Sequence, residues 1–456
     1  MSADNERSPT FVRYMVLAWL CAAAAIAYIC RNSIAVAENT IRTALGLSDF
    51  EIVGITLTPK DQMGYAMSAF FVTYAIFQLP TGWLGHRLGT RKALPIFAVL
   101  WSVFTAWLGL ASGFVSLMLA RLGGGMAQAG IFPCCTNTTA KWFPTTGRGF
   151  ASGALGSFMS VGGALGAVLT GYLLWLFEQQ EFLDFCQRVG VVRMVGVPDW
   201  RWVFLLFSIP GMAWAIWFYV WFRDYPDEHR SVNVEELAII YENAAPPARS
   251  EHEPTPWRQI LTSRAMWWIC GQQFCRAAGY IFFASWFATY LQETRHVNTA
   301  ESGVLTSLPL LAVVVGSLLG GRVSDLIMER TGSVRLSRQV LAAVTQAICG
   351  LLVLVSYPIS QAWLAVMVIS MGAFFSAVAG PCGYTITIDL GGRHVTTVFS
   401  MMNMSGNIGA IVFPAMAPRL VALTGDWDLV LLAFAGFYFA AAICWACLDP
   451  REKVAD

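Results

Sequence analysis

The sequence predicts an all-α membrane protein with twelve transmembrane helices arranged as two six-helix bundles. Of its 456 residues, 56% are hydrophobic and only 12% are charged, whereas a soluble domain carries about 25% charged residues. Twelve apolar stretches each approach the roughly 20 residues that a helix needs to cross the hydrocarbon core of a bilayer. One long polar stretch separates the first six from the last six. The lipid bilayer is therefore the expected main solvent of this chain.

The elements follow one another without a long interruption except at this polar stretch. Residues 1–13 form a short tail without a charged leader or a cleavage site, so we expect the first span to be retained. The predicted N-terminal bundle covers residues 14–222 and the C-terminal bundle residues 265–448. A proline-rich linker, 223–264, lies between them, and a tail, 449–456, follows. The predicted spans are 14–37, 63–86, 93–112, 115–140, 149–177, 200–222, 265–291, 302–325, 339–358, 361–388, 395–422 and 427–448.

Charge distribution predicts the orientation. With the N-terminus inside, eighteen lysines and arginines fall in cytoplasmic segments and six in outer loops, which agrees with the positive-inside rule. Both termini and the linker are then cytoplasmic, and a bacterial inner membrane is the expected location. The net charge of +1 gives no support for a nucleic-acid partner. Ten of the eleven cysteines lie in spans and only Cys186 outside, so no structural disulfide is predicted.

The two halves share a weak internal repeat. Gly147-Arg148 precedes span five and Gly392-Arg393 precedes span eleven, 245 residues later. Arg31 in span one and Arg276 in span seven are separated by the same interval, and Pro133-Cys134 and Pro381-Cys382 by 248 residues. Parallel six-helix repeats are typical of transporters in which two bundles rock around a site near the bilayer midplane.

Three arginines, Arg31, Arg121 and Arg276, lie inside predicted spans, where a charge costs about 2.5–3.5 kcal/mol on insertion scales. The sequence has no Asp or Glu deep in any span; Glu38, Asp325 and Asp389 sit at span ends. Snorkelling to an interface is the alternative and is poorest for Arg276. We therefore expect arginines facing a shared aqueous cavity, where the guanidinium fork binds carboxylate, phosphate or sulfonate groups.

Polar side chains lie within one or two helical turns of these arginines, or share a face of another span. Each one alone is also compatible with helix–helix packing. Together they form the predicted lining of the binding site, which comprises Tyr28, Tyr74, Gln78, Gln128, Tyr280, Asn403 and Asn407. In span five, small residues recur, and Gly162 and Gly166 predict a close helix–helix approach. No nucleotide-binding, metal or nucleophile motif is present, so we predict no cofactor, no metal and no enzymatic activity.

Several motifs carry a family resemblance over nearly the whole chain. The segment from Gly82 to Lys92 resembles the signature loop of the major facilitator superfamily, and a degraded copy runs from Gly321 to Asp325. The first span, from Tyr28 to Ala37, looks like that of the anion:cation symporter family, which includes bacterial sugar-acid symporters and vesicular glutamate transporters. Further similar segments are Tyr74–Pro80, Lys141–Pro144, Phe274–Arg276, Trp286–Leu291 and Asn403–Asn407.

The resemblance implies roles for individual residues. Arg31 and Arg276 would bind the substrate anion, with Tyr28, Tyr74, Gln78 and Asn403 lining the cavity, and Arg121 would match a functional arginine in span four. The signature loop and its copy imply a gating role for Arg87, Arg91 and Asp325.

Three departures from the family pattern bear on coupling. Cys30 replaces the aspartate that commonly precedes the span-one arginine, Gln128 replaces a protonatable glutamate, and His86 replaces the signature-loop aspartate. Because a thiol with a reference pKa of about 8.5 is a poor proton carrier at neutral pH, proton symport is not carried over.

The predicted function is transport of small organic anions, with carboxylates expected, by alternating access in a monomer. The coupling ion, co-transported or exchanged, stays open. A sugar-phosphate:phosphate exchanger is the second hypothesis, since those proteins also use arginines in spans one and seven. A transport-dead sensor or scaffold is a third, disfavoured because the tails are short.

Overall fold

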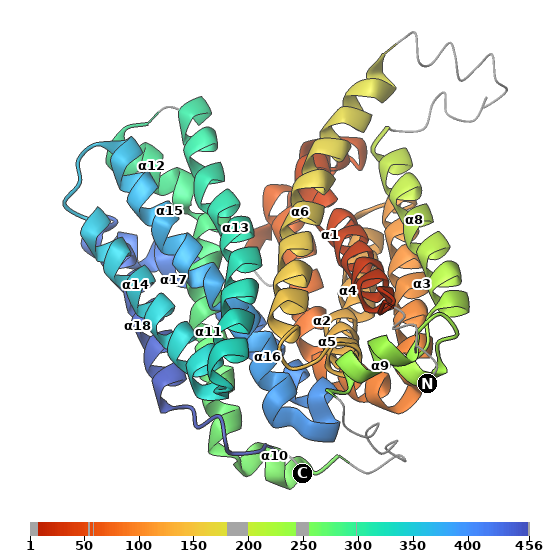
Figure 1. Ribbon diagram of the computed structural model, residues 1–456. Coiled ribbons are helices and arrows are strands. Elements are labelled where there is room, and N and C mark those ends of the chain that lie inside the picture. Colours follow the sequence, from red (N-terminus) through yellow and green to blue (C-terminus); the bar gives the residue numbers. More distant parts are fainter. Residues whose placement is uncertain are drawn as a thin grey trace, which may run out of the picture. The chain divides into compact units, whose positions relative to one another are not determined.

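The computed structural model describes residues 8–52, 55–57, 59–179, 199–242, 255–297 and 299–454. The predicted extramembranous Cys186, most of the linker's proline-rich part and residues 1–7 lie outside these ranges. Helices dominate the described part (Figure 1). Their bounds are α1 (Val12–Ala44), α2 (Pro59–Leu88), α3 (Thr90–Gly109), α4 (Phe114–Gln128), α5 (Ile131–Trp142), α6 (Arg148–Glu178), α8 (Asp199–Trp221), α9 (Val234–Ile240), α10 (Trp257–Thr262), α11 (Arg264–Ser285), α12 (Phe287–Arg295), α13 (Thr299–Thr331), α14 (Leu341–Ser356), α15 (Ala362–Val378), α16 (Gly380–Gly391), α17 (Val395–Thr424) and α18 (Asp428–Cys447).

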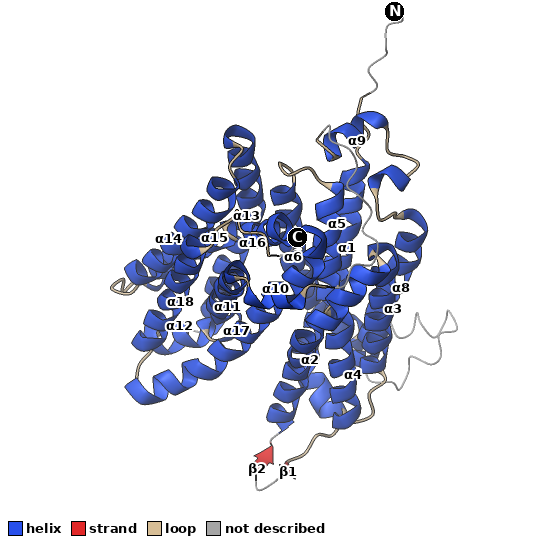
Figure 2. Ribbon diagram, turned by 90° about the horizontal axis from the view of Figure 1, so that it is seen from below, coloured by secondary structure: helices blue, strands red, loops and turns tan. Residues whose placement is uncertain are grey.

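Two short strands interrupt this pattern. Strands β1 (Phe50–Ile52) and β2 (Ile55–Leu57) pair antiparallel, with Phe50 opposite Leu57, just before α2 (Figure 2). The sequence analysis did not predict this hairpin. Three single turns complete the set: η2 (Pro226–Glu228), a π-helical η3 (Arg335–Val340) that leads into α14, and η4 (Gly392–His394) before α17.

Every predicted span has a helical counterpart. Nine helical segments of the described chain are long and apolar enough to cross a membrane, and one of them, Ala362–Phe413, covers predicted span ten and the first part of span eleven. The remaining two predicted spans coincide with α2 and α11. Helix α11 carries Gln272, Gln273 and Arg276, so its polar residues lower its hydropathy.

Three predicted spans are each divided into two helices. Span four divides into α4 and α5 at Ala129-Gly130, and span ten divides into α15 and α16 at Ala379. Pro133 and Pro381 follow these breaks within a few residues. Proline has no amide hydrogen and clashes with the carbonyl four residues earlier, which accounts for both interruptions. Span seven divides into α11 and α12 at Trp286, where no proline is present.

The chain forms two compact units that do not divide at the linker. The first comprises residues 1–18, 133–157 and 223–456, and the second residues 19–132 and 158–222. In the first unit α11 packs on α17 and α18, and α14 on α15 and α18; in the second, α3 packs on α8 and α4, and α2 on α4 (Figure 1). The division into bundles at 14–222 and 265–448 stays a prediction.

The N-terminal part of α6 belongs to the first unit, where its small residues lie close to α13. The Ser157 hydroxyl donates to the Val314 carbonyl at 3.2 Å, and the Ser317 hydroxyl donates to the Gly153 carbonyl at 3.3 Å. A Cβ atom on Gly321 would lie 2.3 Å from the carbonyl oxygen of Gly149. Helices α6 and α13 therefore touch backbone to backbone here, although they belong to different predicted bundles.

The linker, which belongs to the first unit, contacts other parts of that unit through two carboxylates, one buried and one exposed. Glu236, on the predicted amphipathic segment that forms α9, is fully buried. It accepts from the backbone amides of Val12 and Arg13, both at 3.1 Å, and so caps the N-terminus of α1. Negative charge at this end of a helix is stabilising. Glu242 accepts from the Thr145 amide at 2.7 Å in the same way, ahead of α6.

In the second unit the close approach predicted for span five is confirmed. A Cβ atom on Gly162 would lie 2.4 Å from the Ala25 carbonyl oxygen, and one on Gly166 would lie 3.0 Å from the Ile29 Cα atom. Both glycines thus press against the α1 turns that precede Arg31. The packing of α6 positions the helix that carries the first candidate ligand.

We expect Gly162→Leu to lower the thermal stability of the detergent-purified protein. The new side chain meets backbone atoms of α1 that cannot rotate away, and overpacking of this kind costs about 1–3 kcal/mol. Gly171→Leu, on the same helix, is the control, because the nearest atom to its Cβ would be a Val36 methyl at 4.0 Å. Equal melting temperatures of the two variants would contradict the close contact.

Candidate functional site

Arg31 lies in an aromatic cage in the second unit. Its guanidinium carbon is 4.5 Å from the ring centroid of Phe71, 4.8 Å from those of Phe70 and Tyr74, and 5.1 Å from that of Tyr28. The residue is only 8% exposed. Cation–π contacts of a desolvated guanidinium are worth about 2 kcal/mol or more, so the rings take over part of the stabilisation that water or a carboxylate would provide.

The guanidinium of Arg31 keeps its hydrogen-bond donors unused. Within the described residues it forms neither an ion pair nor a side-chain hydrogen bond, and none of its nitrogens is closed off from solvent without a partner. Five N–H donors in a planar fork are thus available to an incoming anion. A guanidinium with unused donors can bind an anion that reaches it.

Arg121 differs from Arg31 in this respect. Its Nε donates to the Ala66 carbonyl at 3.3 Å, and its two terminal nitrogens to the carbonyls of Arg31 at 3.3 Å and Met67 at 3.5 Å. Its guanidinium also lies 4.6 Å from the Phe70 ring centroid. Arg121 therefore ties α4 to the backbones of α1 and α2 and adds positive charge beside Arg31, while its own donors are occupied.

The side-chain amides of Gln128 and Gln78 differ in their hydrogen bonding. Gln128 is buried and donates from Nε2 to the Ala27 carbonyl at 3.1 Å, a second link between α4 and α1. Gln78 is fully buried, and neither its amide oxygen nor its amide nitrogen has a hydrogen-bond partner in the described chain. Tyr74 lies one turn before Gln78 and forms part of the cage. The structure thus places Tyr28, Tyr74 and Arg121 around Arg31, and Gln128 against the α1 backbone one turn earlier.

Arg276 lies in the first unit, in more polar surroundings. Its Nε donates to the Gln273 side-chain oxygen at 3.2 Å, and the residue is partly exposed. No carboxylate pairs with it in the described residues. Tyr280 lies one turn further along α11, against the aromatic core of this unit. On α17, Asn407 donates from Nδ2 to the Asn403 carbonyl at 2.8 Å. The convergence of Arg276 with Arg31 stays a prediction.

The sequence analysis missed three residues of these surroundings: Phe70, Phe71 and Gln273. Phe70 and Phe71 lie one turn before Tyr74 on the same helix. Gln273 likewise lies one turn before Arg276. Aromatic residues in an apolar span carry no distinguishing mark in the sequence, so only the packing reveals that they surround a cation.

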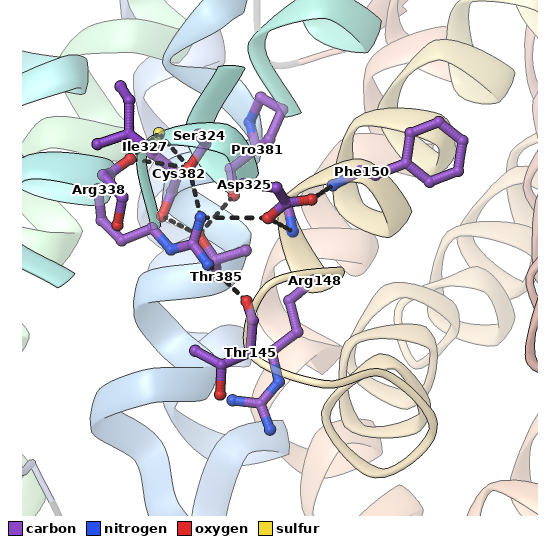
Figure 3. Close-up of polar contacts among 12 residues, drawn as sticks. Thr145, Arg148, Phe150, Ser324, Asp325, Ile327, Arg338, Pro381, Cys382 and Thr385 are labelled. Carbon is purple, nitrogen blue, oxygen red and sulfur yellow. Dashed lines mark hydrogen bonds and ion pairs between the residues drawn. The ribbon is translucent and has the colours of Figure 1, made fainter. Parts of the chain in front are cut away.

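A buried cluster of charges surrounds the predicted gating residue Asp325 (Figure 3). Its carboxylate accepts from the amides of Gly149 at 2.9 Å and Phe150 at 2.6 Å, at the N-terminus of α6. The Arg338 guanidinium lies 3.6 Å away, and both side chains are fully buried. Arg338 also donates to the Thr145 carbonyl at 3.0 Å and to the Ser324 hydroxyl. The sequence analysis placed Arg338 among the cytoplasmic charges and did not recognise it as this partner.

Asp389 extends the cluster. It lies 3.5 Å from the Arg338 Nε and 3.4 Å from a terminal nitrogen of Arg148. We call Arg148, Asp325, Arg338 and Asp389 the charge cluster. Its two positive and two negative charges balance, unlike Arg31, which has no carboxylate partner in the described residues. It links the start of α6 to α13, α16 and the turn before α14.

The other two predicted gating residues have different contacts. The Arg87 guanidinium lies 5.2 Å from the Trp83 ring centroid. Arg91 donates from Nε to the Tyr219 carbonyl at 3.2 Å and lies 5.1 Å from the Tyr219 ring centroid, which ties α3 to α8. Both residues belong to the second unit, whereas Asp325 belongs to the first. Their gating role stays a prediction.

Curated relatives cover nearly the whole chain. It is 28% identical to the probable sulfoacetate transporter SauU of Cupriavidus necator, with 97% of this chain and 95% of the relative aligned. It is 28% identical to the probable galactarate/D-glucarate transporter GudP of Bacillus subtilis (98% and 94%) and 28% identical to the D-galactonate transporter of Escherichia coli (94% and 97%).

Solved structures and a family model identify the fold. The chain superposes on the outward-conformation structure of the transporter FucP with a TM-score of 0.72 at 14% identity, covering 96% of this chain and 99% of the other. For the proton:xylose symporter XylE the TM-score is 0.70 at 14% identity, with 97% and 98% covered. The family model described as Major Facilitator Superfamily matches residues 20–378 and 272–456. The predicted all-α fold is confirmed, and this multi-pass membrane protein belongs to the major facilitator superfamily.

Proposed function

We propose that the protein is a secondary transporter of small organic anions that carry an acidic group at each end, and that it works by alternating access. The observation that carries the proposal is Arg31, a buried guanidinium held by four aromatic rings with its donors unused. In an apolar environment, such a group gains most from an anion that the protein itself does not supply.

The substrates named for two of the three relatives have two charged ends, whereas D-galactonate, named for the third, has a single carboxylate. Sulfoacetate has a sulfonate and a carboxylate, and galactarate and D-glucarate each have two terminal carboxylates. Arg31 and Arg276 lie at equivalent places in the internal repeat, one in each predicted bundle. We propose that both arginines bind the substrate anion, with Tyr28, Tyr74, Gln78, Tyr280, Asn403 and Asn407 as further substrate-binding residues.

At two positions where the family pattern has an acidic residue, this chain has Cys30 and Gln128. Both side chains favour a coupling mechanism that does not use a proton site at these positions. The Cys30 thiol donates to the Phe207 carbonyl at 3.4 Å, and Gln128 is bonded to Ala27. An inside-negative potential opposes uptake by about 2.3 kcal/mol per negative charge per 100 mV, so a dianion needs a counter-transported anion or a co-transported cation. We propose exchange or cation symport at the cell membrane of a bacterium, with a monomeric transporter whose termini are cytoplasmic.

Transport by purified protein in liposomes tests this function. We expect Arg276→Ala to abolish uptake of a two-ended anion such as sulfoacetate or galactarate while the variant keeps the wild-type melting temperature. Arg322→Ala is the matched control, because Arg322 lies on α13 with its side chain 55% exposed. Full uptake by Arg276→Ala would contradict the proposal. Competition by inorganic phosphate, but not by dicarboxylates, would instead indicate an organophosphate:phosphate exchanger.

A further inference from the structure

Phe70 contacts both buried arginines of the second unit. Its ring centroid lies 4.8 Å from the guanidinium carbon of Arg31 and 4.6 Å from that of Arg121. The two arginines are themselves adjacent, since Arg121 donates to the Arg31 carbonyl at 3.3 Å. One uncharged ring, on a residue only 2% exposed, thus contacts two positive charges that have no carboxylate partner in the described residues.

Helix packing holds Phe70 in place independently of these charges. Its ring stacks on that of Tyr74, with a centroid distance of 5.9 Å and an interplanar angle of 17°. A Cβ atom on Gly125 would lie 2.1 Å from the Phe70 carbonyl oxygen, so α2 and α4 touch backbone to backbone at this turn. The Thr73 hydroxyl adds a link by donating to the Leu122 carbonyl at 2.7 Å. The ring is therefore a fixed surface against which the two guanidinium groups lie.

The ring stabilises the two charges without neutralising them. The face of an aromatic ring carries a negative potential that attracts cations, and the attraction is stronger where water is excluded. Two positive charges repel each other in surroundings of low dielectric constant, so a ring that attracts both of them offsets part of this repulsion. In the empty site, Phe70 thus supplies part of the stabilisation that a bound anion would supply.

The same negative potential acts against a bound anion. When an anion pairs with the Arg31 guanidinium, the ring still attracts the arginine but repels the anion. The ring therefore stabilises the empty site more than the occupied one. Because affinity depends on the difference between these two states, the ring lowers it. A transporter benefits from this effect, since a substrate that binds too tightly is not released.

We propose that Phe70 is a positioning residue that stabilises the guanidinium groups of Arg31 and Arg121 in the empty transporter and thereby limits the affinity for the substrate anion. This role rests on the proposed function and deepens it by naming a residue that promotes substrate release. Phe70 acts through the two arginines and needs no contact with the substrate. All three residues belong to the second unit.

Fluorination of the Phe70 ring tests this role with little change of shape. Each fluorine withdraws electron density from the ring face and weakens its attraction for a cation. We replace Phe70 by singly, doubly and triply fluorinated phenylalanine in the full-length protein and measure binding of sulfoacetate and galactarate by calorimetry. Affinity should rise stepwise, by about three- to tenfold for the triply fluorinated ring. The melting temperature of the ligand-free protein should fall by about 2 °C or more.

Phe204 is the matched control. Its side chain is fully buried in the same unit, and no cation lies over its ring within the described residues. Triply fluorinated phenylalanine at this position should leave the affinity unchanged. Unchanged or weaker binding after fluorination at position 70 would overturn the proposed role, because a ring that only fills space cannot strengthen binding when its face becomes less negative. The singly fluorinated variant gives the sign of the effect if the triply fluorinated one does not fold.

An arginine variant separates this inference from the function on which it rests. In Arg31→Gln, fluorination at position 70 should lower the melting temperature by less than in the wild-type background, since one of the two cations is absent. Equal losses would contradict the role of the ring. If the wild-type protein binds both anions and fluorination does not tighten binding, only the role of Phe70 is wrong. If the wild-type protein binds neither anion, this role and the proposed function both fall.

Discussion

Replacing Arg31 by glutamine is expected to weaken substrate binding by at least about 100-fold, since two charge-assisted hydrogen bonds of about 1.5–3 kcal/mol each are lost. Glutamine keeps one donor and a similar length, but it has neither the charge nor the fork. No carboxylate of the described chain pairs with Arg31, so removing the arginine leaves no buried negative charge without its partner. We therefore expect a stable protein that does not transport. Uptake in liposomes and the melting temperature check the two halves of this result.

Arg42→Gln provides the matched control on the same helix. Arg42 is bonded to Glu38 at 2.9 Å, and both side chains are 26% exposed. Surface pairs of this kind contribute about 0–1 kcal/mol, so transport and stability should both stay close to wild type. If Arg31→Gln and Arg42→Gln transported equally well, the aromatic cage would be a structural device for burying a cation and not a binding site.

The second large effect is expected at the charge cluster. Asp325→Asn removes the negative charge of a carboxylate that accepts hydrogen bonds from the backbone amides of Gly149 and Phe150. The same carboxylate pairs with the buried Arg338. The contact between α6 and α13 should weaken, because hydrogen bonds to a charged acceptor contribute about 1.5–3 kcal/mol each. Hydrogen–deuterium exchange of the segment after Arg148 should then become about 10–100-fold faster.

This contact joins helices of the two predicted bundles, so its opening is the expected event when the cytoplasmic side opens during transport. Glu329→Gln is the control, since Glu329 lies on the same α13 and pairs with Arg322 at the exposed surface. Unchanged exchange in Asp325→Asn would show that the glycine and serine contacts hold α6 against α13 without the carboxylate. In that case Asp325 would have no part in gating.

The fold was predictable from the sequence because a bilayer imposes simple rules. Every backbone polar group must be satisfied within a helix, and each crossing needs about 20 apolar residues, so apolar stretches of the sequence predicted twelve spans, each of which has a helical counterpart. The two strands before α2 were not predicted, since they lie in a connection between two predicted spans, where no bilayer constrains the pattern. The breaks near Pro133 and Pro381 followed from proline chemistry, whereas the one at Trp286 had no mark in the sequence.

For the candidate site, the sequence by itself determined which charges are out of place. Arg31, Arg121 and Arg276 stand in apolar spans without acidic neighbours, and the cost of burying a charge makes them conspicuous in any such chain. Their separate roles depended on three-dimensional contacts. Only the tertiary structure decided that Arg31 lies within four rings with its donors unused, that Arg121 is bonded to backbone carbonyls, and that Arg338 is the partner of Asp325. The physical reason is that burial cost depends on one residue and its span, whereas hydrogen bonds and cation–π contacts depend on how distant helices pack.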